Sequence, residues 1–288
     1  MFERLINLFR RPSAHFQRGQ RYENGDGVAQ DYARARACYE AAGAYPEALV
    51  ALGRLYYYGR GGAQDDGRAR DCWERAAAAG NGEALFRLGQ LYAEAAGVKQ
   101  DWARARDYWE QAAANGHGEA LFNLGLLYVA GQGVEVDGKR AWEYWQWAAE
   151  AGSGEALYHL GEWAAQGPQP DWARARDFWQ RAAERGHRDA LVQLGALYAQ
   201  GLGGPRDWER ARHCYEQAAA AGSGEALFYL GLLYENGKGV PKDDDRAQDY
   251  YRRGAALGHA GARARVKEPW REGAVDMDLA RARSQPRP

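Results

Sequence analysis

The residues of this chain that could do chemistry recur at fixed intervals instead of gathering around one point. An acidic residue returns every 34 or 36 residues, and a histidine occupies the same turn position in three of the copies. This row of carboxylates could recognise a basic peptide, or each carboxylate could oppose the dipole of its own helix at the first turn. The acids are Glu47, Glu83, Glu119, Glu155, Asp189 and Glu225, and the histidines are His117, His187 and His259.

No set of residue types has the spacing that catalysis requires. The three histidines are separated by whole copies, so we do not expect them to converge on a metal ion. Glycine pairs such as Gly131 and Gly133 have neither the Lys-Ser or Lys-Thr pair nor the preceding strand of a phosphate-binding loop. We therefore predict no catalytic, cofactor-binding or metal-binding residue, and we treat an enzyme as the minor alternative.

Apolar side chains also occupy a position that faces away from the expected core. Counted from the acidic residue as position one, positions two, three, six, seven, nine and ten are apolar or small, which is the period of an α-helix. Position four lies on the opposite face, and it carries Phe16, Val50, Phe86, Phe122, Tyr158, Val192 and Phe228. These side chains could line a groove that grips a segment of another protein, or they could bury one another.

The groove hypothesis predicts a set of partner-binding side chains on the concave face of the array. They stand at positions four, eight, eleven and twelve, and several of them vary between copies where packing alone would tolerate uniformity. The predicted residues are Arg54, Tyr57, Tyr58, Phe86, Gln90, Phe122, Leu126, Tyr158, Glu162, Phe228 and Leu232.

Helix pairs in a repeat array must position these side chains. An aspartate such as Asp101 precedes the second helix of every copy and predicts an N-cap, and an aromatic residue such as Trp109 follows within that helix. Position seven is always glycine, as at Gly89, and since glycine costs about 1 kcal/mol relative to alanine inside a helix, it predicts a close helix crossing. The predicted fold is all-α, a right-handed α/α superhelix (solenoid) of about seven helix-turn-helix repeats with end caps.

The order of these motifs resembles the Sel-one-like repeat (SLR), a relative of the tetratricopeptide repeat. The similar string is Ala-Leu-x-x-Leu-Gly-x-Leu-Tyr, as at 84–92, followed by Gly-x-Gly-Val, Asp, Ala, Tyr-Trp and Ala-Ala. The resemblance implies an adaptor or scaffold that assembles larger complexes. Some bacterial cysteine-rich members of the family were proposed to bind cell-wall precursors or antibiotics. This chain lacks their paired cysteines, and we predict that Cys38, Cys72 and Cys214 are small core residues in a reducing compartment.

The two ends of the chain depart from the repeat. We predict an N-terminal amphipathic cap helix at 1–13, seven repeats at 14–261, and a C-terminal capping helix and tail at 262–288. The apolar residues Phe2, Leu5, Ile6 and Phe9 share one helical face. That face favours docking on the first repeat, with membrane contact through Met1–Arg11 as the alternative. The first eleven residues contain no apolar run long enough for a signal peptide or a membrane span, so we predict a cytoplasmic location.

The charge balance excludes one large class of partner. The chain has 38 basic and 39 acidic residues, and acids interrupt its arginines everywhere, so no basic stripe for nucleic acid exists in the sequence. The sequence therefore predicts a bacterial scaffold or adaptor that binds a polypeptide along its concave face. The alternative is a protein that binds a small molecule or a cell-wall fragment, with a hydrolase of cell-wall-related substrates as a weaker one.

Overall fold

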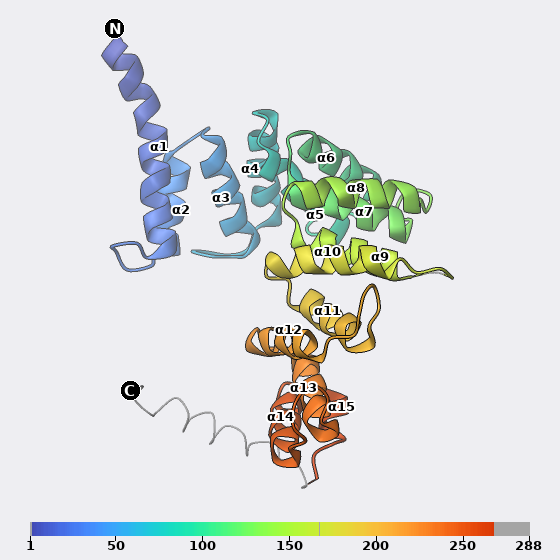
Figure 1. Cartoon of the computed structure of the whole chain (residues 1–288). Helices are drawn as coiled ribbons and strands as arrows, with labels where there is room; N and C mark the ends of the chain where they lie inside the picture. The colour runs from blue at the N-terminus through green and yellow to red at the C-terminus, as the bar shows by residue number, and fades with distance from the viewer. Residues whose placement is uncertain (1, 167, 268–288) are drawn as a thin grey trace. The chain divides into compact units, whose positions relative to one another are not determined.

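A computed structural model describes residues 2–166 and 168–267, with side chains from residue 12 onward. Within these ranges the chain forms helices and no strand (Figure 1). It divides into two compact units, Met1–Ala151 and Gly152–Pro288, and each is described by itself below.

Each unit is built from pairs of helices that pack side by side. The pairs of the first unit are α1 (Phe2–Asn24) with α2 (Tyr32–Ala41), α3 (Pro46–Tyr57) with α4 (Asp66–Ala78), α5 (Gly82–Glu94) with α6 (Trp102–Ala114), and α7 (Gly118–Ala130) with α8 (Gly138–Glu150). The pairs of the second unit are α9 (Gly154–Ala165) with α10 (Trp172–Glu184), α11 (Arg188–Gln200) with α12 (Trp208–Ala220), and α13 (Gly224–Asn236) with α14 (Asp244–Ala256). A short helix, α15 (Ala260–Arg263), packs on α13 and α14. The predicted all-α array of helix-turn-helix repeats is confirmed.

An aspartate caps the second helix of every pair, as the sequence predicts. Its side-chain Oδ1 accepts a hydrogen bond from the backbone N–H three residues later, at 2.9–3.0 Å. This bond satisfies one of the amides that a helix start leaves without a partner. The capping residues are Asp31, Asp65, Asp101, Asp137, Asp171, Asp207 and Asp243.

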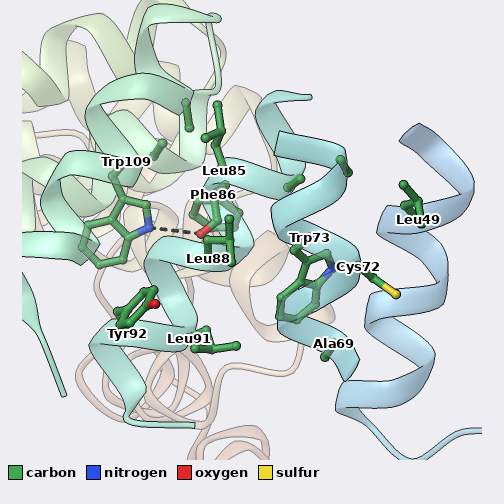
Figure 2. Close-up of a cluster of buried hydrophobic side chains, with 14 of the residues drawn as sticks. Leu49, Ala69, Cys72, Trp73, Leu85, Phe86, Leu88, Leu91, Tyr92 and Trp109 are labelled. Carbon is green, nitrogen blue, oxygen red and sulfur yellow. Dashed lines mark hydrogen bonds between the residues drawn. The ribbon is translucent and has the colours of Figure 1, made fainter. Parts of the chain in front are cut away.

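The glycine at position seven lets an aromatic side chain of the second helix lie against the backbone of the first. A Cβ atom on Gly89 would overlap the indole of Trp109. Figure 2 shows that indole pointing at the α5 backbone, where Trp109 Nε1 donates to the carbonyl oxygen of Phe86 at 3.3 Å. The pairs Gly53 with Trp73 and Gly125 with Trp145 repeat this contact. The predicted close crossing is therefore confirmed, and it lies within each repeat.

Tyrosines at position ten connect one pair to the next. The Arg36 guanidinium of α2 lies 3.9 Å from the ring centroid of Tyr56 in α3, and Arg68 of α4 donates to the Tyr56 hydroxyl. Arg176 covers Tyr198 in the second unit in the same way, at 4.2 Å. These arginine side chains cover the aromatic rings. The positive guanidinium is attracted to the ring face, and the methylene groups shield the ring from water.

The two ends are described only in part. The backbone is helical from Phe2 to Asn24, but the side chains of Met1–Arg11 lie outside the described residues, so docking and membrane contact both stay predictions. Of the predicted C-terminal segment, α15 and the residues to Lys267 are described, and 268–288 lie outside. Among the described helices, none has both the length and the apolar character needed to cross a membrane.

Candidate functional site

A cavity of about 190 Å³ opens between α3 and α5 in the first unit. The side chains that line it are Arg54, Tyr57, Tyr58, Trp73, Arg87, Gln90, Leu91 and Glu94. Four of them, Arg54, Tyr57, Tyr58 and Gln90, are among the predicted partner-binding residues. Two consecutive first helices therefore bring predicted residues together at one place.

Aromatic rings form one wall of this cavity. The Tyr57 ring lies 5.6 Å from Trp73 and meets Tyr58 edge-on at 5.0 Å. The Tyr57 hydroxyl donates to Glu94 Oε2 at 2.9 Å, and burial together with that carboxylate raises the pKa of Tyr57 to about 12. Tyr57 thus stays a hydrogen-bond donor, while Tyr58 leaves 54% of its surface exposed.

Two arginines, one from α3 and one from α5, also line the cavity, and acids hold each of them in place. Arg54 Nη2 donates to Glu23 Oε1 at 2.6 Å, and the Glu23 carboxylate also accepts from the buried Tyr39 hydroxyl at 2.6 Å. Arg87 donates from Nε to Glu83 Oε1 at 2.7 Å. Because α1 holds Arg54 through Glu23, the cavity depends on three consecutive repeats.

Glu83 joins the cavity to the next repeat through a histidine. His117 Nε2 lies 2.9 Å from Glu83 Oε2, while His117 Nδ1 accepts from the backbone N–H of Ala120 and caps α7. An accepting Nδ1 leaves the hydrogen of the neutral imidazole on Nε2, which donates to the carboxylate. His187 makes the same two contacts, with Glu155 and Ala190.

A low pH should weaken the contact between Glu83 and His117. The pKa of the Glu83 carboxyl falls to about 2, chiefly because His117 donates to it and also because Arg87 lies beside it. When folding lowers the pKa of a carboxyl group, the group stabilises the folded state at every pH above its ordinary pKa of about 4.3. That stabilisation disappears as the pH falls from about 4.3 towards 2. Since Glu83 is 38% exposed and screened by solvent, we expect on the order of 1 kcal/mol. Urea unfolding at pH 7, 4 and 3 should show this loss in the wild type and a smaller one in Glu83→Gln; equal losses in both proteins would contradict it.

The repeat unit matches one known family along almost the whole chain. The Sel1 repeat matches seven times, at residues 12–44, 46–81, 82–117, 118–153, 154–187, 188–223 and 224–259. The chain belongs to the Sel1 repeat family. Proteins built from Sel1 repeats generally mediate protein–protein interactions and are generally non-catalytic.

Solved structures of Sel1-type proteins resemble the chain. A protective antigen of uropathogenic Escherichia coli strains, which has an SLR fold, is 30% identical with a TM-score of 0.75. The alignment covers 93% of this chain and 57% of the antigen, so the chain spans a little over half of that protein's length. A Sel1 repeat protein from Oxalobacter formigenes is 27% identical with a TM-score of 0.69, covering 83% of this chain and 96% of that protein. No curated protein matches the chain significantly.

The other predicted residues of the first unit differ from one another in exposure. Phe86 is 2% exposed and stacks on the His117 ring at 4.5 Å, so its side chain belongs to the packing between Sel1 repeats. Phe122 is half-buried, and its backbone carbonyl accepts from the indole of Trp145. Leu126 is 37% exposed. It stands at position eight of its repeat, the position that Arg54 occupies on α3 and Gln90 on α5.

The remaining predicted residues lie in the second unit and are half-buried. Tyr158 stacks on His187 at 4.5 Å, and its neighbour on α9, Glu162, pairs with His159. Phe228 of α13 packs on His259 at 5.0 Å, and Leu232 follows one turn later in the same helix. Phe86, Tyr158 and Phe228 at position four therefore each meet the histidine that caps the helix after the next one in the chain.

The structure adds two charged residues to the site that the sequence did not single out. Arg87 stands at position five, which carries Asn123, Gln193 and other types in different copies and gives no pattern. Glu94 stands at position twelve, on the face already assigned to the partner, so the positional rule could have found it. The same rule points to Val129 at position eleven of α7, which is 39% exposed.

Proposed function

We propose that this Sel1 repeat protein is a scaffold or adaptor that binds another polypeptide along the face formed by its first helices. The main support is the cavity between α3 and α5, where Arg54, Tyr57, Tyr58 and Gln90 from two repeats meet. The exposed Leu126 extends the same face onto α7. In the second unit we assign Tyr158, Glu162, Phe228 and Leu232 to the corresponding face.

The size of the cavity favours a polypeptide over a small-molecule ligand. Pockets for drug-sized ligands commonly measure about 300–1,000 Å³. The cavity, at about 190 Å³, is smaller than that range and is continuous with an exposed surface. A surface of this kind suits one side chain of a longer segment, whose other residues contact the neighbouring helices.

The thiols support a cytoplasmic location for the proposed scaffold. Cys38, Cys72 and Cys214 are all free, and burial raises the pKa of Cys72 and of Cys214 to about 11. Cys72 and Cys214 are buried and therefore behave as small apolar side chains, whereas Cys38 is only half-buried.

Affinity capture with one pair of variants tests the proposed function. Leu126→Glu places a charge on the proposed face, while Val136→Glu places the same charge on a residue that is 70% exposed in the loop before α8. We expect the wild type and Val136→Glu to capture the same protein from cells that express the chain, and Leu126→Glu to lose at least nine-tenths of it. Circular dichroism should show equal helix content in all three.

Two outcomes would contradict the scaffold. Equal capture by both variants would mean that this face takes no part in the interaction. Saturable binding of a cell-wall fragment, with no protein captured, would instead favour the small-ligand alternative.

A further inference from the structure

We infer that the cavity between α3 and α5 receives an aspartate or glutamate side chain from within the partner's segment, with an apolar residue beside it. This inference rests on the proposed function, because it names the chemistry of the partner at the same site. It follows from the hydrogen-bonding groups of the lining, the anchoring of its arginines, and the exposed residues on either side.

The cavity offers more hydrogen-bond donors than acceptors. A guanidinium carries five N–H donors. Arg54 donates to Glu23, and Arg87 donates to Glu83 and Gln90, so both retain further N–H groups. Among the lining residues the one carboxylate is Glu94, and its Oε2 already accepts from Tyr57. An acceptor-rich group complements this lining, and a carboxylate accepts from a guanidinium with two parallel bonds.

The two arginines are held in position before any partner arrives. Glu23 is nearly fully buried behind Arg54, and Glu83 is itself held by His117. An entering carboxylate therefore meets donors that are already oriented, which lowers the entropy lost on binding.

The surroundings favour a residue inside the segment over a free C-terminal carboxylate. A space of about 190 Å³ corresponds to roughly six water molecules at about 30 Å³ each, which is enough for one side chain. Exposed apolar residues adjoin the arginines, with Tyr58 of the lining at the end of α3 and with Leu126 and Val129 on α7. A segment that reaches from Tyr58 across the cavity to Leu126 places the acid between its own apolar residues, inside the segment.

Peptide selection on the full chain tests this inference. The probes are two libraries of random dodecapeptides, one joined to its carrier through the C-terminus and one with a free C-terminus. We expect the first library to enrich Asp or Glu beside an aromatic or aliphatic residue. For a selected peptide, replacing the acid with Gln or Asn should weaken the Kd at least tenfold.

Matched variants connect the acid preference to the cavity. Arg54→Gln with Arg87→Gln should weaken binding of that peptide at least tenfold. Arg68→Gln with Arg104→Gln removes the same charge from the second helices and should change the Kd less than twofold. Glu94→Gln keeps an acceptor for Tyr57 and removes the negative charge of the one carboxylate in the lining, so it should tighten binding about threefold. This variant keeps the test decisive if the arginine pair fails to fold.

Several results would overturn the inference. Three concern the selection itself: enrichment of apolar peptides without an acid, enrichment only with free C-termini, and no enrichment over the carrier. The fourth is a preference for an acid that is unchanged in both the arginine double variant and Glu94→Gln. Each leaves the proposed function to be decided separately, by the capture that depends on Leu126.

Discussion

Trp109→Ala should lower the free energy of unfolding of the first unit by about 3–5 kcal/mol. The indole is 5% exposed, lies against Gly89, and donates to the Phe86 carbonyl. Its removal leaves a cavity between α5 and α6 and takes from the Phe86 carbonyl the hydrogen bond that it accepts in addition to the one within its helix, and both effects destabilise. Because each repeat is stabilised mainly by its neighbours, the loss should also weaken the adjacent pairs. Urea unfolding followed by circular dichroism measures the change.

Trp147→Ala is the matched control for this prediction. Trp147 lies in α8, in the same unit, and is 49% exposed, with an edge-on contact to Tyr144 at 5.4 Å. We expect it to lose no more than about 1 kcal/mol, the size of an aromatic pair. Similar losses for the two tryptophans would mean that the indole–glycine contact does not hold the repeat together.

Much of the fold could be predicted because its determinants are local and repeated. The Asp101 cap needs only the amides of the next turn, so its place in the sequence specifies its role. Gly89 and Trp109 are 20 residues apart but recur together in register, and that recurrence is enough to predict a close contact between their helices. In this repeat array the same residue pattern occurs seven times, so a pattern that arises by chance in one copy can be recognised because the other copies lack it.

The site could be predicted only in part, because it depends on contacts between repeats. The period places Phe86 on the face opposite the core, but the period does not say that His117 of the next repeat covers it. Arg54 and Tyr57 could be placed on one face of their helix from the period alone, whereas their pairing with Glu23 and Glu94 joins separate repeats at distances of 31 and 37 residues in sequence. Side-chain partners of this kind vary between copies, so repetition gives no help.

Glu23 is the least predictable of these residues, and Glu23→Ala should reduce the free energy of unfolding by about 2–3 kcal/mol. In the sequence it is one acid among many near a helix end, yet it is nearly fully buried and accepts from both Tyr39 and Arg54. Its removal leaves the hydroxyl of Tyr39, a fully buried residue, without an acceptor, and takes away the counter-charge of Arg54. A buried donor left unsatisfied costs about 1–3 kcal/mol, and more when a charge is involved.

Glu40→Ala is the control that separates burial from hydrogen bonding. The Glu40 carboxylate also accepts from a tyrosine hydroxyl, that of Tyr56 at 2.9 Å, but its side chain is 50% exposed and water can replace it. We expect Glu40→Ala to cost less than about 1 kcal/mol, within the range of an exposed polar contact. Chemical unfolding of the two variants under the same conditions measures the difference, and equal costs would contradict the view that α1 anchors Arg54 from inside the fold. A larger cost for Glu23→Ala would mean that the wall of the cavity is part of the core, so that one acid both stabilises the first two repeats and positions the guanidinium that we assign to the partner.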